Sequence, residues 1–280
     1  MDFHFINFIK EREYLHNVSK RTLQWYTNCF SAWKKYATDN DPMKFVVNMR
    51  EAGVLPVSCN TYICGMNAYF KWAGEPIKLR KLKLEQRILA TLTDGHIKSL
   101  ISYRPGGTNS VRAHIVALTI LDTGLRISEI LGLSKENVDW DQLTLRVHGK
   151  GGKHRLVPFS FELRKRLFRY VNPVKDSVPG SAPTPTLLFG TKNNTKVSVR
   201  NIERDFEILG KSVGITGVRF SPHTLRHSFA VGYLRAGGNL EFLRRILGHS
   251  SILTTQKYLR SLGVEDLRAV HNSLSLLTRG

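Results

Sequence analysis

The spacing of apolar residues changes along this 280-residue chain, and the change limits the folds that it can adopt. Over the first 75 residues apolar side chains recur three and four positions apart, as at Leu23 and Tyr26, which predicts amphipathic helices. Residues 143–148 and 154–159 instead alternate apolar and polar side chains around a glycine-rich stretch at 149–152, which predicts a β-hairpin. The sequence therefore predicts a mostly α fold with a small antiparallel β-sheet, of the α+β class.

Breaks in these patterns divide the chain into two predicted units. Glycine and proline residues end the third and fourth of the early helices, so residues 1–75 are expected to form a compact four-helix domain. Residues 76–91 mix basic and aliphatic side chains without a helical stripe and are expected to be an interdomain linker. Residues 92–280 would then form a second, larger domain, which ends in an amphipathic helix over 264–278.

The charge of the chain is strongly positive. Lysine and arginine number 42 against 22 acidic residues, a formal net charge of +20 at pH 7. Such a charge exceeds what solubility requires and favours a polyanionic partner, DNA or RNA. The basic excess lies in both predicted domains, so both are expected to face the nucleic acid.

Cysteine content and hydropathy indicate where the protein works. Cys29, Cys59 and Cys64 form no C-x-x-C pair, so neither a disulfide framework nor a zinc site is predicted, and a reducing cytoplasm fits best. No run approaches the roughly 18 apolar residues of a membrane span. The first residues also lack the pattern of a signal peptide, so neither a membrane nor secretion is expected.

Three segments place polar side chains beside the ends of apolar helices. Taken singly, each has an ordinary explanation, since an arginine there is usually a cap, a histidine a core residue and a tyrosine a packing residue. Together they form a set that suits phosphoryl transfer. Its members are Arg126 and Glu129 in GLRISE, His223 and Arg226 in HTLRH, and His249 and Tyr258 in the segment that begins with LGH.

The chemistry of these side chains favours covalent attack on a phosphodiester. The guanidiniums of Arg126 and Arg226 can hold nonbridging oxygens of one phosphate and neutralise charge that develops at phosphorus. Lys150, at the tip of the hairpin, is a candidate general acid for the leaving oxygen, and Lys153 is the alternative. The Tyr258 hydroxyl has an ordinary pKa of about 10, so it needs nearby cations and a proton acceptor to act as a nucleophile.

A tyrosine nucleophile also removes the need for an energy source. The phosphotyrosine keeps the energy of the cut bond, so a DNA hydroxyl can reverse the attack without ATP.

His223 precedes Arg226 by one helical turn, so both side chains face the same way. No P-loop and no carboxylate cluster for Mg²⁺ stands out, and neither a cofactor nor a metal is expected.

The order and spacing of these residues resemble the tyrosine recombinases of the phage integrase family, in particular the Xer-type members. The motifs that carry the resemblance are TGLRISE, GKGGKHRLVP, HTLRHSFA, LGHSS and TTQKYLR. The resemblance implies that Arg126, Arg226 and His249 bind the scissile phosphate. It further implies that Lys150 protonates the 5′-oxygen, that His223 assists proton transfer and that Tyr258 forms a 3′-phosphotyrosyl link. Glu129 takes the place of an acidic residue that supports the site.

The resemblance implies an assembly as well. The first domain would be a SAM-like core-binding domain that clamps double-stranded DNA at core recombination sites together with the catalytic domain. The protein would be a monomer in solution and a homotetramer on DNA, with helix 264–278 docked either on a neighbour or on its own domain. An activating protein is a further possible partner. Linker residues that would contact phosphates, unless the linker is merely solvated, are Lys78, Arg80, Lys81, Lys83 and Arg87.

Two other functions remain open at this point. A type IB topoisomerase uses a similar set of residues to relax DNA, and a sequence-specific DNA-binding protein could carry a degenerate site. The short helical first domain and the apolar stripe after Tyr258 favour recombination over relaxation. A module that only binds DNA has no need of Tyr258 or Lys150, so a site-specific recombinase is the preferred interpretation.

Overall fold

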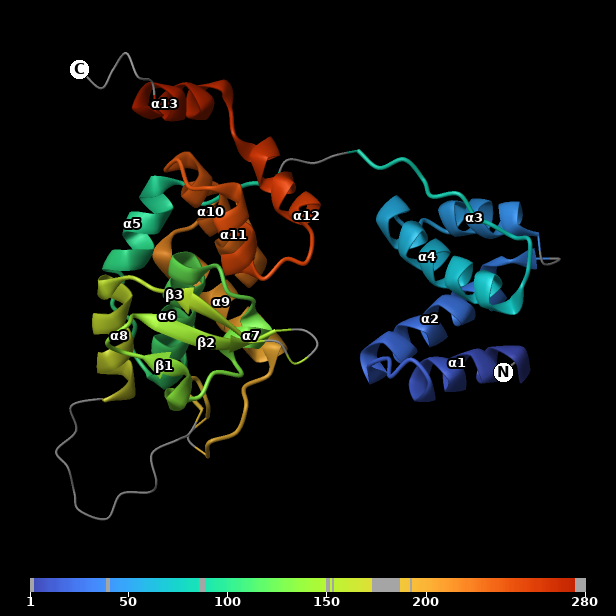
Figure 1. Cartoon of the computed structure of the whole chain (residues 1–280), viewed down its shortest axis with the longest axis horizontal. Coiled ribbons are helices and arrows are strands. Elements are labelled where there is room, and N and C mark those ends of the chain that lie inside the picture. Colours follow the sequence, from blue (N-terminus) through green and yellow to red (C-terminus); the bar gives the residue numbers. More distant parts are fainter. Residues whose placement is uncertain are drawn as a thin grey trace. The chain divides into compact units, whose positions relative to one another are not determined.

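The computed structural model divides into two compact units, Met1–Arg87 and Ile88–Gly280 (Figure 1). The division falls inside the segment predicted as a linker. The structure describes residues 3–38, 41–85, 89–149, 152, 154–172, 187–191 and 193–274. Within those ranges, none of the helices is both long and apolar enough to cross a membrane.

The first unit consists of helices around an aromatic core. Ser19 caps the second helix by accepting a hydrogen bond from the amide of Thr22, and Asp41 caps the third through the amide of Met43. Phe5 stacks on Phe30 at a ring-centroid distance of 3.9 Å in the centre of the unit. The helices are α1 (Phe3–Tyr14), α2 (Lys20–Tyr36), α3 (Pro42–Glu51) and α4 (Pro56–Ala73).

Residues 75–85 have no regular secondary structure, yet they are fixed along α4 by two asparagines. Asn67 donates to the carbonyl of Leu79 and accepts from its amide, at 2.9 and 2.8 Å. Asn60 does the same for Leu82, at 2.9 and 2.7 Å. Each asparagine thus pairs with the main chain as a neighbouring strand would. The basic residues between and beside these anchors are exposed: Lys78, Arg80, Lys81 and Lys83. Arg87 lies outside the described residues.

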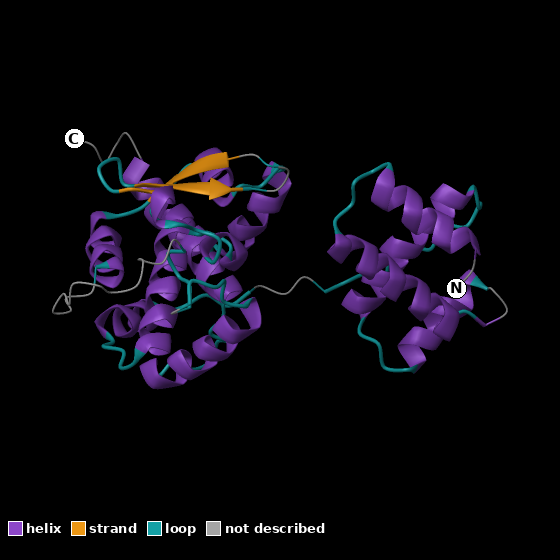
Figure 2. Ribbon diagram, turned by 90° about the horizontal axis from the view of Figure 1, so that it is seen from below, coloured by secondary structure: helices purple, strands orange, loops and turns teal. Residues whose placement is uncertain are grey.

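The second unit is mostly helical, with a small sheet that Figure 2 shows in orange at one side. The sheet is antiparallel in the order β1-β2-β3. The helices that precede the hairpin and the strands are α5 (Asp94–Ser102), α6 (Thr108–Thr123), α7 (Ile127–Ile130), η2 (Lys135–Asn137), β1 (Val138–Asp139), β2 (Thr144–His148) and β3 (His154–Pro158). The later elements are α8 (Phe161–Val171), α9 (Val199–Val213), α10 (Pro222–Arg235), α11 (Leu240–Leu247), α12 (Ile252–Gln256), η3 (Lys257–Ser261) and α13 (Val264–Leu274).

The predicted fold class is confirmed: the chain is mostly helical with one small antiparallel sheet. The hairpin strands agree with the prediction to within one residue at each end. Strand β1 and helix α8 were not predicted. The predicted helix 264–278 is described from Val264 to Leu274, and its last residues lie outside the described range.

Helix α6 organises the second unit. It packs against α8, α9 and α10, and its side chains are buried on nearly every face. A helix that is apolar all round belongs in a core, so the elements around it are held in fixed places. Gly124 ends α6 with a left-handed φ of 64°, and a Cβ there would collide with Phe229 of α10. The turn after α6 is therefore held tightly against α10.

Candidate active site

Two arginines converge on one main-chain carbonyl. Nη1 of Arg126 and Nη2 of Arg226 donate to the oxygen of Leu247 at 3.1 and 2.9 Å. Leu247 is the last residue of α11, so its carbonyl has no partner within the helix. Arg226 also donates to the carbonyl of Gly124 at the end of α6. The ends of two helices, where partial negative charge gathers, therefore hold both guanidiniums.

His249 joins this cluster with a defined tautomer. Its Nε2 lies 3.0 Å from Nη2 of Arg226, and a guanidinium can only donate, so Nε2 accepts. The proton is then on Nδ1, which lies 3.0 Å from Oγ1 of Thr255. Burial lowers the pKa of His249 to about 4, and the charges of Arg226, Arg126 and Arg155 act in the same direction. His249 is therefore neutral at pH 7.

Tyr258 lies beside the same groups, on the short 3₁₀ helix η3. Its side chain is 9% exposed, and its ring lies parallel to that of His249 at a centroid distance of 6.2 Å. Burial and the charge of Arg126 lower the pKa of Arg226 to about 10, while the side chains of Tyr258 and Glu129 oppose the shift. The proximity of Tyr258 to a buried guanidinium is the arrangement that a tyrosine nucleophile requires.

Glu129 balances part of the positive charge. Its Oε1 accepts from Nη1 of Arg126 at 3.0 Å, and its Oε2 accepts from the amide of Arg126 at 2.9 Å. Arg155 of β3 binds both oxygens of the same carboxylate, at 3.0 and 2.9 Å. Burial alone would raise the pKa of Glu129, but the hydrogen bonds and charges of Arg155 and Arg126 outweigh it and lower the pKa.

The cluster keeps an excess of positive charge that faces solvent on one side. Three guanidiniums surround the single carboxylate of Glu129. The side chain of Arg126 is 42% exposed, whereas that of Glu129 is 8% exposed. An anion can therefore reach Arg126 from solvent, whereas Arg226 is buried next to it.

Comparison with known proteins identifies the family to which this arrangement belongs. The model of the phage integrase family matches residues 90–263, which include all the residues of the cluster. The chain belongs to the phage integrase family. The tyrosine recombinase XerA of Pyrococcus furiosus is 32% identical over 256 residues, which cover 88% of this chain and 85% of that protein. The chain is thus a Xer-like tyrosine site-specific recombinase.

Other relatives match a similarly large share of the chain. The tyrosine recombinase XerD of Chlorobaculum tepidum is 29% identical over 265 residues, which cover 88% of this chain and 83% of that protein. The solved structure of the Tn1549 transposon integrase in complex with a circular intermediate DNA has a TM-score of 0.73 at 20% identity. It covers 95% of this chain and 97% of that chain, which shows a shared fold.

Of the remaining predicted site residues, the structure describes His223 but not the two candidate lysines. His223 is exposed in the first turn of α10, one turn before Arg226, and it is not part of the hydrogen-bonded cluster that the structure describes. Lys150 and Lys153 lie outside the described residues, so the choice between them as general acid stays open. The strands that lead to the hairpin tip end at His148 and begin again at His154.

Arg155 is a member of the cluster that was not predicted from the sequence. Besides binding Glu129, its Nε donates to the carbonyl of Ile246 at 3.0 Å, so it ties the hairpin to the end of α11. The signal was present in the alternation of β3, because Arg155 shares a face with the buried Val157 and pairs across the sheet with the buried Val147. A charged residue on the apolar face of a strand requires a buried partner.

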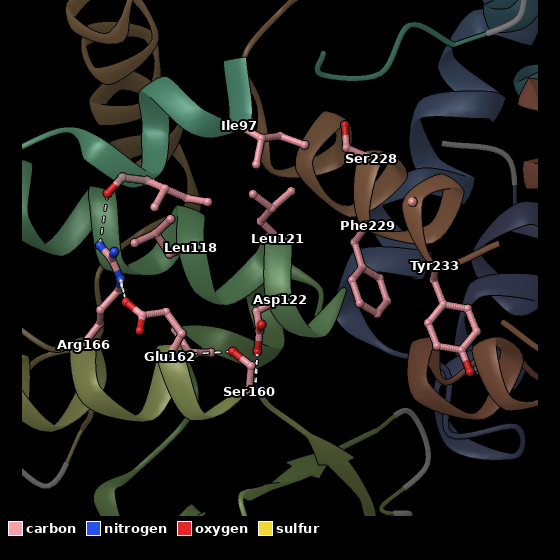
Figure 3. A pocket seen from close by; sticks show the side chains of 13 residues that line it. Ile97, Leu118, Leu121, Asp122, Ser160, Glu162, Arg166, Ser228, Phe229 and Tyr233 are labelled. Atoms are coloured by element: carbon pink, nitrogen blue, oxygen red, sulfur yellow. Dashed lines mark hydrogen bonds and ion pairs between the residues drawn. The ribbon is translucent and has the colours of Figure 1, made fainter. Parts of the chain in front are cut away.

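A separate cavity of about 450 Å³ lies in the same unit between α5, α6, α8 and α10 (Figure 3). At its edge Arg166 bonds to Glu162 and to the carbonyl of Ile101, and Asp122 accepts from the amide of Ser160. Its walls are mainly apolar, and they include Ile97, Leu118, Leu121, Leu163 and Phe229. The cavity shares no residue with the arginine cluster.

No group of three or more His, Cys, Asp or Glu side chains is arranged to hold a metal ion in the parts of the chain that the structure describes. The polar residues of the site are instead bonded to one another and to helix ends. The site is thus built around cationic side chains.

Proposed function

We propose that this recombinase cleaves and rejoins double-stranded DNA at specific sites through a covalent bond between Tyr258 and a 3′-phosphate. The observation that carries the proposal is the convergence of Arg126 and Arg226 on the carbonyl of Leu247, with Tyr258 beside them. The phosphotyrosine conserves the energy of the broken bond, so the reaction needs no ATP. The guanidiniums of Arg126 and Arg226 would stabilise the charge at phosphorus, so no metal cofactor is needed for that role.

The scissile phosphate would take the place where the two guanidiniums meet. Each guanidinium can turn a donor from the Leu247 carbonyl to a nonbridging oxygen of the phosphate. The two arginines then stabilise the charge that grows on those oxygens in the transition state. A bound phosphate anion would also raise the pKa of His249, which lets His249 serve as a third donor.

The chemical step then balances as a simple transfer. The Tyr258 oxygen forms a bond to phosphorus while the bond from phosphorus to the 5′-oxygen breaks. Lys150, or Lys153 in its place, supplies the proton that the 5′-oxygen needs, and His223 assists removal of the tyrosine proton. Attack by a 5′-hydroxyl on the phosphotyrosine reverses these steps and seals the strand.

The partner would be duplex DNA, and the active assembly a tetramer on two sites. A net charge of +20 and the exposed basic residues of segment 76–85 support DNA binding by both units. Solved relatives include XerH bound to its difH substrate and a lambda integrase dimer bound to a core site. Val264 and Leu267 of α13 are 72% and 58% exposed, which supports docking of this helix on a neighbouring protomer.

The proposed role of the first unit and the proposed assembly follow from the resemblance to tyrosine recombinases. The first unit would act as the core-binding domain, and the enzyme would be a monomer until it meets DNA in the cytoplasm. An activating protein would be a further partner.

Trapping the covalent intermediate tests the proposal. The enzyme is incubated with nicked suicide duplexes from its own genetic surroundings, in the presence of a chelator, and analysed on a denaturing gel. We expect a covalent protein–DNA band that is absent with Tyr258→Phe, while that variant still binds DNA. Tight binding by the wild type without any covalent band would favour a non-catalytic binding protein. Relaxation of a one-site plasmid without exchange on a two-site plasmid would favour a topoisomerase.

A modified substrate tests the general acid. Lys150→Ala should slow cleavage of an ordinary duplex, by about 100-fold or more, because the 5′-oxygen leaves without a proton. A sulfur atom at the 5′-bridging position leaves without protonation, so a 5′-phosphorothiolate duplex should restore the rate. Lys153→Ala is the matched control, and rescue of that variant alone would move the role to Lys153.

A further inference from the structure

A second histidine of α10, His227, lies next to the nucleophile. Its side chain is buried, and its ring centroid is 5.3 Å from that of Tyr258. Its Nε2 is 3.1 Å from the carbonyl oxygen of Leu89 and 3.2 Å from Oγ of Ser261. His227 therefore contacts the nucleophile, the helix that carries it and the segment in which the second unit begins.

The contacts of Nε2 show which ring nitrogen of His227 carries the proton. A carbonyl oxygen can only accept, so Nε2 carries the proton and donates it to Leu89, and the Ser261 hydroxyl oxygen shares it as a second acceptor. Burial lowers the pKa of His227, the hydrogen bond to Leu89 opposes this, and the charge of His223 lowers the pKa further. The ring is therefore neutral, with Nε2 as a fixed donor to Leu89 and Ser261.

The segment that His227 holds is itself firmly anchored. The amide of Leu92 donates to Oγ of Ser228 at 2.8 Å, and the Leu92 side chain is buried in the core. Two adjacent residues of α10, His227 and Ser228, thus fasten the chain at 89–92. One of them reaches across to Ser261 at the same time.

The helix on the other side of His227 has little rigidity of its own. Helix η3 is a single 3₁₀ segment of five residues, a geometry with poorer hydrogen bonds than an α-helix. Its position therefore depends on its side-chain contacts. Displacement of a nucleophile by about 1 Å can cost roughly 100-fold in rate.

We propose that His227 is a positioning residue, which sets the place of the Tyr258 hydroxyl through its hydrogen bond to Ser261. It acts through the tyrosine and not on the reacting atoms. The proposal rests on the proposed function, in which Tyr258 is the nucleophile.

The experiment compares His227→Leu, which removes the donor and keeps much of the volume, with His227→Gln, whose Nε2 can still donate to Leu89. Single-turnover formation of the covalent adduct is measured at saturating enzyme, together with DNA affinity. We expect His227→Leu to slow adduct formation by about 10- to 100-fold with unchanged affinity. His227→Gln should recover most of the rate.

His114 provides a matched control, because it is another buried histidine of the same unit whose Nε2 contacts a carbonyl, that of Leu100 at 2.7 Å. His114→Leu should lower the melting temperature and leave adduct formation by the folded enzyme unchanged. Equal slowing by His114→Leu and His227→Leu would reduce His227 to a structural residue and overturn the proposal.

A second arm separates the tyrosine from the phosphate site. In a Tyr258→Phe background, hydrogen peroxide is supplied as an external nucleophile that needs no positioned tyrosine. Adding His227→Leu should leave peroxide-dependent cleavage unchanged. An equal loss in both assays would place the effect on Arg226 and the phosphate, against the proposal.

The outcomes remain distinguishable from failure of the proposed function. If the wild type forms no adduct, the tyrosine mechanism fails, whereas a wild-type rate in His227→Leu refutes only the role of His227. If His227→Leu does not fold, Ser261→Ala carries the test, because it removes only the acceptor on η3. Slower adduct formation by Ser261→Ala supports the proposal, and a wild-type rate overturns it.

Discussion

The carbonyl of Leu247 receives two guanidiniums, which brings like charges together at a partly buried site. Such an arrangement costs free energy unless opposite charge is close. Glu129 supplies a full negative charge, and the ends of α6 and α11 supply partial charges. Under the proposed function, the positive charge that Glu129 and the helix ends leave unbalanced would bind the scissile phosphate. The cluster is thus organised before any DNA is bound, as electrostatic catalysis requires.

The neutral His249 makes the stability of the enzyme depend on pH. Its pKa is about 4 in the folded protein and about 6.5 when unfolded, so the unfolded chain binds more protons between these values. Stability should therefore fall as the pH falls from 6.5 towards 4, by up to about 1.4 kcal/mol per pH unit for this one group. Urea denaturation at several pH values measures the slope.

His249→Gln removes this group and should flatten the slope. His114 and His227 also have lowered pKa values from burial, so part of the dependence should remain. His96→Gln is the control, since His96 is not buried. An unchanged slope in His249→Gln would show that His249 is already protonated in the folded enzyme.

At the scale of residues, candidate side chains could be selected from the sequence, but the contacts between side chains could not. The arginines, His249 and Tyr258 could be chosen because their types and order suit one reaction. Arg155 could not be chosen that way, because its role is to hold Glu129 and the carbonyl of Ile246. Such a role depends on which elements meet in space.

At the scale of elements, the turn after α11 leaves little room for a side chain. Gly248 has a φ of 64°, and a Cβ there would lie 2.7 Å from Cζ of Arg155. The left-handed turn carries the chain from Leu247 to His249, so one glycine sets the relation between two members of the site.

Gly248→Ala should therefore destabilise the enzyme by at least about 2 kcal/mol, from backbone strain together with overpacking against Arg155. Gly214→Ala is the matched control. Gly214 ends α9 with a φ of 77° and has open space around a Cβ, so only the strain, about 1 kcal/mol, applies. Chemical denaturation of both variants gives the comparison, and equal losses would show that the contact with Arg155 can relax.

The hairpin and most helices could be predicted because their periodicity is local. The short β1 could not, because two residues carry no pattern and pair only once β2 is in place. The course of residues 75–85 was equally hidden, because Asn60 and Asn67 look like ordinary polar positions of a helix. Their pairing with Leu79 and Leu82 is a tertiary feature.

At the scale of the whole molecule, the charge of +20 predicts the response of DNA binding to salt. DNA affinity should fall as salt is added. Each phosphate that the protein neutralises should steepen the fall of log affinity against log salt concentration by about 0.9. Lys78→Ala should reduce the slope by about one unit if this exposed residue contacts a phosphate. Lys165→Ala, at a residue paired with Glu162, should leave it unchanged. Equal slopes for all three proteins would show that Lys78 contacts no phosphate.

Under the proposed function, the Leu247 carbonyl would also act as an internal competitor of the substrate. In the free enzyme it occupies one donor of Arg126 and one of Arg226, and a phosphate bound as proposed would compete with it for those donors. The affinity of the site for phosphate is then a difference between two sets of hydrogen bonds, and not the full strength of one. After religation the carbonyl would reclaim both guanidiniums, and under the proposed function this exchange would speed the departure of the sealed strand and favour turnover over retention of product.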